Sequence, residues 1–190
     1  MGHREDLLAG AKRCLYEKGY ARTTARDIVA ASGTNLASIG YHYGSKEALM
    51  NAALIDAVGD FARALEEAEA KADDTPPGSL ERFRAAWQRI IEVGAVDPKL
   101  WAANFELLAQ VAHNPELRES FRDVQGVARE GLAEGFQDLA ALGPEKAWKV
   151  GTVYHAMLIG VMAQWLIAPE LAPSADDLAD GLRIIMENAS

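Results

Sequence analysis

Hydrophobic side chains along this chain recur every three or four residues, the spacing that predicts amphipathic helices. The first such segment runs from Glu5 to Lys18, carries Leu7 and Leu15 on one side, and closes at Gly19. The sequence contains no strand-like alternation of apolar and polar residues and no long internal repeat. The pattern therefore predicts an all-α fold.

Three helix-forming segments follow between residues 24 and 50. Thr24 is a good N-cap for a short helix that Gly33 stops. A second short helix restarts near Asn35 and covers Leu36 to Tyr43, and Lys46 opens the third. A helix, a tight glycine turn and a second helix form the layout of a DNA-reading unit, because the first helix braces the second and leaves its outer face free for the major groove.

The third helix is long, and a linker follows it. Its apolar positions continue to about Lys71, and the segment Asp73 to Ser79 contains Pro76-Pro77-Gly78, which breaks the helical periodicity. We therefore expect an N-terminal three-helix domain over residues 1–50 and a helical domain over residues 51–190. Because the long helix crosses this boundary, the two domains should be mechanically connected.

Beyond the linker, helical periodicity continues to the end of the chain. Start and stop signals predict five more helices there. They are a helix capped by Ser79, one that starts at Asp97-Pro98, one from about Pro115 to Leu142, one within Trp148 to Ala168, and one capped by Ser174.

The segment from Trp148 to Ala168 is the most apolar in the chain. It is close to the length that spans a bilayer, but Thr152, His155 and Gln164 interrupt it and no topology signal flanks it. A helix that is apolar nearly all round needs partners on every side. Since the glycines at 151 and 160 permit close helix approach, we expect one face to lie on the bundle core and the other on a dimer partner, with no membrane contact.

Composition places the protein among ordinary soluble globular proteins, with 190 residues of which 49% are hydrophobic and 25% charged. The single cysteine, Cys14, excludes an internal disulfide and favours the reducing cytoplasm. Cys14 is either a small core residue, the interpretation that we favour, or a redox-sensitive thiol. No basic and apolar leader opens the sequence, so no export signal is expected.

A net charge of −9 by itself argues against nucleic-acid binding, but the charge is unevenly divided along the chain. Residues 1–50 hold seven Lys and Arg against five Asp and Glu, a balance of +2, whereas the remaining residues hold 12 against 23, a balance of −11. An acidic body repels phosphate and leaves the N-terminal end attractive, which would orient the molecule on DNA. A balance of +2 is modest, so dimerisation would have to double the contacts.

The first fifty residues also resemble a known family. The segment GTNLASIGYHYGSKEALM is similar to the recognition-helix region of the TetR family of one-component transcriptional regulators, and LLAGAKRCLYEKGYARTTARDIVAASG is similar to its first two helices. Gly40 departs from the family, which usually has a large residue there. The resemblance implies a homodimeric, ligand-responsive DNA-binding protein, most simply a repressor, paired through a two-fold four-helix contact of residues 148–168 and 174–188.

The candidate DNA-contacting residues lie in or beside the short second and third helices. Asn and Ser side chains can hydrogen-bond base edges, small apolar side chains can pack on thymine methyl groups, and Tyr and Lys can hold phosphates. Tyr43 is equally well explained as a partly buried core residue. The candidates are Thr24, Asn35, Leu36, Ala37, Ser38, Tyr41, His42, Tyr43 and Lys46.

A small hydrophobic or aromatic effector is expected in the C-terminal helices, on the strength of the resemblance. Large residues at helical spacing are more often plain core, and that alternative stays open. The candidate ligand-binding residues are Phe83, Trp87, Trp101, Asn104, Phe105, Phe121, Gln125, Tyr154 and Met157, with His155 and Trp165 as further possibilities.

The sequence carries no enzyme signature: there is no Walker loop, no HExxH, no GxSxG and no Cys/His set at metal-binding spacing. We therefore expect neither an enzyme nor a cofactor or metal. The expected partners are double-stranded operator DNA, a small-molecule effector and a second copy of the chain. Two alternatives remain: a helical small-molecule binding protein or small enzyme with no DNA role, and a repressor that responds to no effector.

Overall fold

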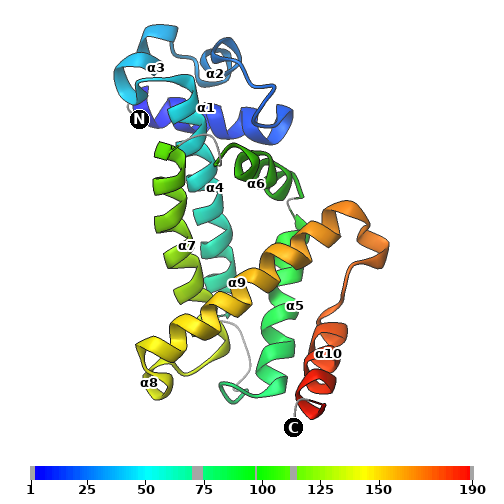
Figure 1. Cartoon of the computed structure of the whole chain (residues 1–190). Helices are drawn as coiled ribbons and strands as arrows, with labels where there is room; N and C mark the ends of the chain where they lie inside the picture. Colours follow the sequence, from blue (N-terminus) through cyan, green and yellow to red (C-terminus); the bar gives the residue numbers. More distant parts are fainter. Residues whose placement is uncertain (1–2, 70–74, 97, 112–114, 189–190) are drawn as a thin grey trace. The chain divides into compact units, whose positions relative to one another are not determined.

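The computed structural model describes residues 3–69, 75–96, 98–111 and 115–188, and every regular element in these ranges is helical. The prediction of an all-α fold is therefore confirmed. The elements, drawn in Figure 1, are α1 (His3–Lys18), α2 (Ala25–Ser32), α3 (Leu36–Tyr43), α4 (Lys46–Glu69), α5 (Leu80–Val96), α6 (Pro98–Val111), α7 (Pro115–Phe136), α8 (Leu139–Leu142), α9 (Pro144–Ile167), the 3₁₀ turn η1 (Pro169–Leu171) and α10 (Ala175–Glu187).

The chain divides into two compact units. The first contains residues 1–60 and 97–121, and the second contains residues 61–96 and 122–190. Both α4 and α7 pass from one unit into the other along the chain. The first unit thus holds α1 to α3, most of α4, and α6, whereas α5, α8, α9 and α10 belong to the second.

The first unit is built on a small apolar core, to which α1, α2 and α3 each contribute. Leu7 and Leu15 of α1, Ile28 of α2 and Ile39 of α3 are all buried. Polar contacts tie α1 and the turn after it to α4: the Lys12 ammonium pairs with Asp56 at 2.5 Å and with Asp60, and the Tyr20 hydroxyl donates to Asn51 Oδ1 at 2.6 Å. The eight-residue helices α2 and α3 need a braced core of this kind, since isolated helices of that length are marginal in water.

An aromatic cluster forms part of the core of the second unit. Four aromatic residues form the cluster, and all are buried: Phe83 and Trp87 of α5, Phe136 of α7 and Tyr154 of α9. Neighbouring rings have centroids 5.7–6.2 Å apart and are tilted against one another. Phe136 and Tyr154 stack with centroids 4.0 Å apart. The Tyr154 hydroxyl accepts from Gln137 Nε2 at 2.8 Å, so its polar end is satisfied inside an apolar setting.

Two predicted helix boundaries are wrong. The helix expected from Pro115 to Leu142 ends at Phe136, because the Asp138 side chain accepts from the N–H groups of Ala140 and Ala141 and starts α8 as a separate turn. The apolar helix expected at Trp148 begins one turn earlier at Pro144, which occupies the first helical turn where its missing N–H costs nothing.

Several other sequence predictions are confirmed or lie outside the described residues. Thr24 and Ser174 are N-caps and Gly33 is a C-cap, as predicted, and the helix that restarts near Asn35 has Asn35 as its N-cap and Gly44, with positive φ, as its C-cap. The first part of the predicted linker, the start signal at Asp97, and residues 112–114 are among the residues that the structure does not describe.

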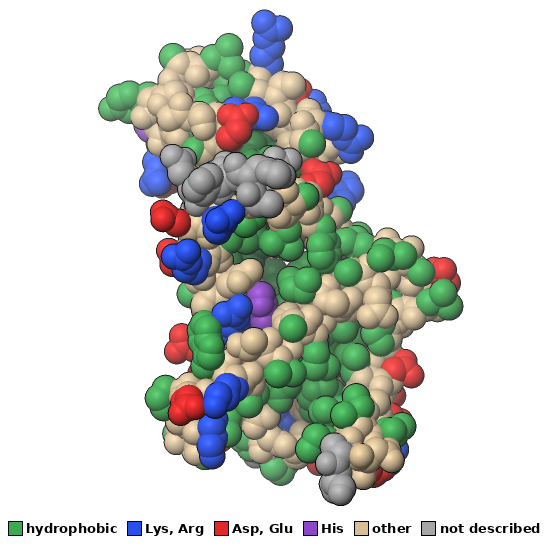
Figure 2. Space-filling view, in the orientation of Figure 1, with side chains coloured by type: hydrophobic (Ala, Val, Ile, Leu, Met, Phe, Trp, Pro, Cys, Tyr) green, Lys and Arg blue, Asp and Glu red, His purple; other side chains and the backbone are tan. Residues whose placement is uncertain are grey.

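One described helix, α9, is long and apolar enough to cross a membrane by length and composition alone. The core helix of a soluble protein passes the same test. Only 28% of the most apolar part of α9 is buried within the chain. Figure 2 shows hydrophobic side chains gathered over α9 on the face in view.

Candidate nucleic-acid interface

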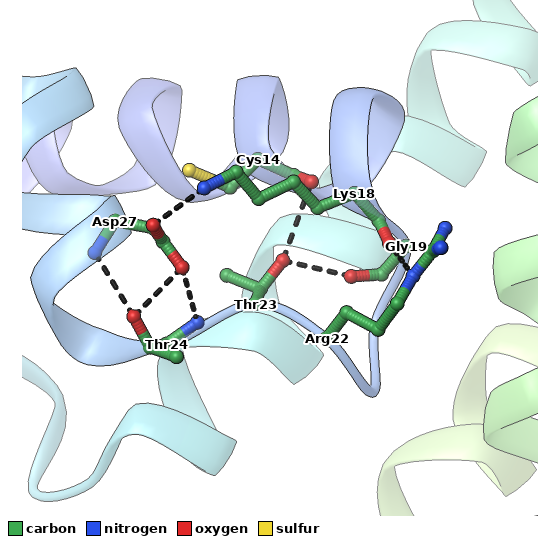
Figure 3. A network of polar contacts seen from close by, with 7 residues as sticks. All are labelled: Cys14, Lys18, Gly19, Arg22, Thr23, Thr24 and Asp27. Atoms are coloured by element: carbon green, nitrogen blue, oxygen red, sulfur yellow. Dashed lines mark hydrogen bonds and ion pairs between the residues drawn. The ribbon is translucent and has the colours of Figure 1, made fainter.

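The start of α2 is fixed by a capping box. The Thr24 hydroxyl oxygen accepts from the Asp27 N–H at 3.2 Å, and the Asp27 carboxylate accepts from the Thr24 N–H at 2.9 Å. Lys18 of α1 adds an ion pair to the same carboxylate at 2.5 Å. Figure 3 shows how these groups converge where α1 ends and α2 begins. The capping box fixes the direction in which α2 begins, and α3 packs against α2.

These contacts shift two pKa values. The hydrogen bond from Lys18, followed by those from Thr24, holds the pKa of the Asp27 carboxyl well below its usual range. The hydrogen bond to Asp27 in turn raises the pKa of Lys18. Both shifts have the sign of an ion pair that favours the charged forms.

Thr23 closes the end of α1 from the inside. It is buried, and its hydroxyl donates to the Gly19 carbonyl at 2.7 Å and lies 3.3 Å from the Cys14 carbonyl. The Gly19 carbonyl follows the last turn of α1, where a carbonyl has no partner within the helix. Lys46, at the start of α4, donates to the Thr23 carbonyl at 3.2 Å. The turn between α1 and α2 is therefore bonded to α1 through the Thr23 hydroxyl and to α4 through the Thr23 carbonyl.

The short helix α3 presents an exposed face. Ile39 anchors it in the core, while Leu36, Ala37 and Tyr41 are exposed, with Tyr41 at 85%. Asn35 caps the helix by accepting from the Ser38 N–H at 3.0 Å. The outer face carries small, polar and aromatic side chains and no carboxylate, so nothing on it repels a phosphate backbone.

The remaining candidates are partly engaged within the protein. Tyr43 is half-buried, its hydroxyl donates to the Arg4 carbonyl at 2.9 Å, and the Arg4 guanidinium lies 5.6 Å from its ring centroid. His42 is half-buried and packs edge-on against Tyr41 with ring centroids 4.8 Å apart. The structure thus places Thr24, Asn35, Leu36, Ala37 and Tyr41 at the surface, and Ser38, His42, Tyr43 and Lys46 at its edge.

Sequence reasoning missed two bracing residues. Arg4 contacts Tyr43 through its backbone and its guanidinium. Glu106 of α6 accepts from the Ala21 N–H at 3.2 Å and packs beside Gly19, which has φ of +82°. Because Glu106 and Ala21 are 85 residues apart, no local signal in the sequence could have paired them. This contact joins α6 to the turn that positions α2.

The candidate ligand-binding residues fall into two groups. Trp101, Asn104, Phe105 and Phe121 belong to the first unit, and the other five belong to the second. Within the second unit, Phe83, Trp87 and Tyr154 are brought together in the aromatic cluster, which Phe136 completes although the sequence did not single it out. Gln125 and Met157 are half-buried on α7 and α9.

A capped helix-turn-helix with an exposed second helix, in a chain whose other unit is an aromatic-rich helical bundle, defines the class of one-component DNA-binding regulators. Comparison with known proteins gives the family. Residues 7–53 match the family described as bacterial regulatory proteins, tetR family, and residues 79–184 match the BetI-type transcriptional repressor, C-terminal family. The chain therefore belongs to the TetR family of ligand-responsive transcriptional regulators.

Individual relatives agree with this assignment. The chain is 26% identical over 186 residues to the HTH-type transcriptional repressor AcnR of Corynebacterium efficiens, and this match covers 96% of the chain and 89% of AcnR. It is 23% identical over 184 residues to the HTH-type transcriptional regulator TtgR of Pseudomonas putida, covering 93% and 85%. A transcriptional regulator from Streptomyces coelicolor A3(2) shares the fold, with a TM-score of 0.72, 21% identity, and coverage of 96% and 97%.

Proposed function

We propose that this protein is a cytoplasmic, homodimeric repressor that leaves its operator when a small hydrophobic or aromatic effector binds. Residues 1–50 act as the DNA-binding domain and residues 51–190 as the effector-binding and dimerisation domain. Two copies of α3 enter successive major grooves, roughly 34–36 Å apart, on a near-palindromic site. It has no catalytic role and requires no cofactor.

The exposed outer face of α3 is the observation that carries this proposal. A side chain as exposed as Tyr41, on a helix held by two caps and a buried Ile39, contributes little to its own domain. A rigid helix with such a face suits groove entry. The contacts are made by the nine residues from Thr24 to Lys46 named above, with Asn35 and Ser38 on base edges and Tyr41, Tyr43 and Lys46 on phosphates.

The dimer is proposed to form through α9 and α10. On α9, Val153, Gly160 and Ile167 are exposed and follow one another at helical spacing, and on α10 Ile184 and Ile185 are exposed. Exposed apolar positions on two helices of one unit are typical of an interface rather than of a solvated surface. A Cβ at Gly160 would meet nothing within 4 Å in this chain, which leaves room for a partner helix to approach.

The effector is proposed to bind among the helices of the second unit, at the five candidate residues that lie there: Phe83, Trp87, Gln125, Tyr154 and Met157. Binding would favour a state in which α4, which starts at Lys46 beside the recognition helix, tilts and changes the spacing of the two copies of α3. Effector and operator then oppose each other by linkage: the factor that the effector removes from DNA affinity, DNA removes from effector affinity.

The DNA half of the proposal is tested with Tyr41 variants. Operator fragments are first selected from random DNA on the immobilised protein and then titrated in gel-shift assays. Tyr41→Ala is expected to lower operator affinity about tenfold or more per dimer, because each protomer loses a phosphate contact worth roughly 1 kcal/mol. Unfolding temperature and dimerisation should stay unchanged, since Tyr41 is exposed.

Tyr41→Phe is the matched variant. If the hydroxyl holds a phosphate, Tyr41→Phe weakens binding as much as Tyr41→Ala does. Lys46→Ala is expected to weaken binding and also to flatten the dependence of affinity on salt, by about one ion per protomer. Unchanged operator affinity in all three variants would refute the DNA contacts proposed for α3 and the start of α4.

A further inference from the structure

An arginine with no ionic partner among the described residues, Arg129, lies where α7 and α9 cross in the second unit. Gly151 of α9 packs directly on the backbone of Arg129 in α7, since a Cβ at Gly151 would collide with the Arg129 carbonyl. The crossing brings the Arg129 side chain beside α9, where its guanidinium lies over the Trp148 ring, 4.8 Å from the centroid. His155 follows Trp148 by two helical turns on the same side of α9.

Part of the hydrogen-bonding capacity of this guanidinium is unused within the described part of the chain. Its Nε is buried without a hydrogen-bond partner, and an Nη2 hydrogen donates to Gln125 Oε1 over a long 3.4 Å. Within the described part of the chain, no carboxylate lies within ion-pair distance of Arg129. A guanidinium has five N–H donors, and a buried donor left unpaired is costly.

The lack of a partner is notable because carboxylates are abundant in this part of the chain. Two other cations of the second unit form ion pairs with carboxylates: Arg84 pairs with Asp176 at 2.6 Å, and Lys149 pairs with Glu145 at 2.7 Å. Arg129 instead contacts the amide of Gln125 and the indole of Trp148, and its charge acts on the imidazole of His155. Such neighbours orient a guanidinium without neutralising it, which leaves its charge for an external anion.

The positive charge of Arg129 also acts on His155. Burial, and after it the positive charge of Arg129, lowers the pKa of the His155 imidazole. Near neutral pH the imidazole is therefore uncharged and retains one N–H donor. Gln125, Arg129 and His155 together offer an amide, a guanidinium and an imidazole at one crossing of two helices.

We propose that Arg129, assisted by Gln125 and His155, binds the anionic group of the effector, a carboxylate or a phosphate. This inference rests on the proposed effector response and narrows its chemistry: the effector is a hydrophobic or aromatic acid rather than a neutral molecule. The guanidinium binds two oxygens of the anion at once, and Trp148 holds the guanidinium plane in place.

The test uses three probes of similar shape, benzoate, phenyl phosphate and benzamide, each at millimolar concentration and constant ionic strength on the full-length protein. Thermal unfolding is followed for the wild type, Arg129→Gln and the matched control Arg122→Gln, which removes an exposed arginine two turns away on the same helix. We expect one or both anions to raise the unfolding temperature of the wild type and of Arg122→Gln. Benzamide, which lacks the charge, should bind at least about tenfold more weakly.

Arg129→Gln is expected to lose the response to both anions and to keep a normal unfolding temperature without them, because it removes an unpaired charge. The anion that stabilises the wild type more identifies the source of the anionic group. If neither anion stabilises the wild type, or if Arg129→Gln responds as the wild type does, the site is refuted. A variant that unfolds earlier yet binds the anions normally would assign Arg129 a structural role and refute it equally.

A second readout follows His155 by NMR. Because the charge of Arg129 lowers the His155 pKa, the bound anion and the Arg129→Gln substitution should each raise it, and the anion should have no further effect in the variant. Operator binding measured on the same samples separates the two proposals. Intact operator binding without any anion response overturns the anion site alone, whereas absent operator binding overturns the proposed function.

Discussion

At the scale of single residues, the DNA-binding unit depends on one carboxylate. Asp27 accepts from the backbone and hydroxyl of Thr24 and from the ammonium of Lys18, and so joins the end of α1 to the start of α2. The pKa of Asp27 is held below its value in the unfolded chain, first by Lys18 and then by Thr24. A carboxyl with this shift stabilises the fold at every pH above its unfolded pKa, and that contribution is lost as the pH falls through the folded value.

Asp27→Asn tests this linkage. The variant should be less stable than the wild type at pH 7, because the amide cannot pair with Lys18. The difference should stay constant down to about pH 4, near the ordinary pKa of an aspartate, and shrink at lower pH as the wild-type carboxyl is protonated. Urea unfolding at pH 7, 4, 3 and 2 measures it, with Asp123→Asn, an exposed position on α7, as the control. A difference of equal size at pH 7 and pH 2 would contradict the ion pair.

At the scale of the helix, α3 has well-capped ends but a residue of low helix propensity in its interior. Asn35 and Gly44 cap it, but Gly40 lies in its interior, where glycine costs helix stability. Gly40 is exposed, and a Cβ there would meet nothing within 4 Å. The cost is therefore not offset by any close packing at Gly40 against the described residues.

Gly40→Ala should raise the free energy of unfolding by about 0.5–1 kcal/mol, because alanine loses less backbone entropy in a helix. Gly33→Ala is the matched control: its Cβ would also be unobstructed, but Gly33 has φ of +69°, so the same substitution should cost about 1–2 kcal/mol. Urea unfolding curves of both variants decide this. If Gly40→Ala is destabilising, α3 is not the regular helix described here. Gel-shift titration of Gly40→Ala then shows whether DNA needs the glycine.

The helices also show how far the sequence could predict the structure. Caps are local: Thr24, Asn35 and Ser174 each bond to a residue three positions on, so their signals stand in the sequence. The break after Phe136 was missed because apolar periodicity continues across it, and only the hydrogen bonds of Asp138 mark it. Contacts distant in sequence, such as Glu106 with Ala21 or Arg129 with Trp148, follow from packing and leave no local pattern.

At the scale of the whole molecule, the uneven division of charge makes DNA binding depend on the dimer that we propose to form through α9. The first fifty residues carry a balance of only +2, so one copy attracts DNA weakly. A second copy doubles the phosphate contacts and ties two half-sites together, which multiplies the affinity through effective concentration. In this scheme, operator binding is lost at low protein concentration whenever the dimer is weakened, even if α3 is intact.

Gly160→Leu isolates this dependence. The substitution should improve the helix propensity of α9 and meets no obstacle within the chain, but it should block the close approach of a partner helix, at a cost of about 1–3 kcal/mol. The dimer dissociation constant should therefore rise roughly 10- to 100-fold, and operator binding should shift to higher protein concentration.

Gly131→Leu provides the control, since Gly131 is also exposed and unobstructed but lies on α7, outside the proposed interface. Analytical ultracentrifugation gives the dimer constant, and gel shifts at matched concentrations give the DNA affinity. Gly160→Leu dimers as tight as those of Gly131→Leu would move the interface away from the exposed row of α9. Weakened dimers with unchanged operator binding would instead show that one copy of α3 suffices.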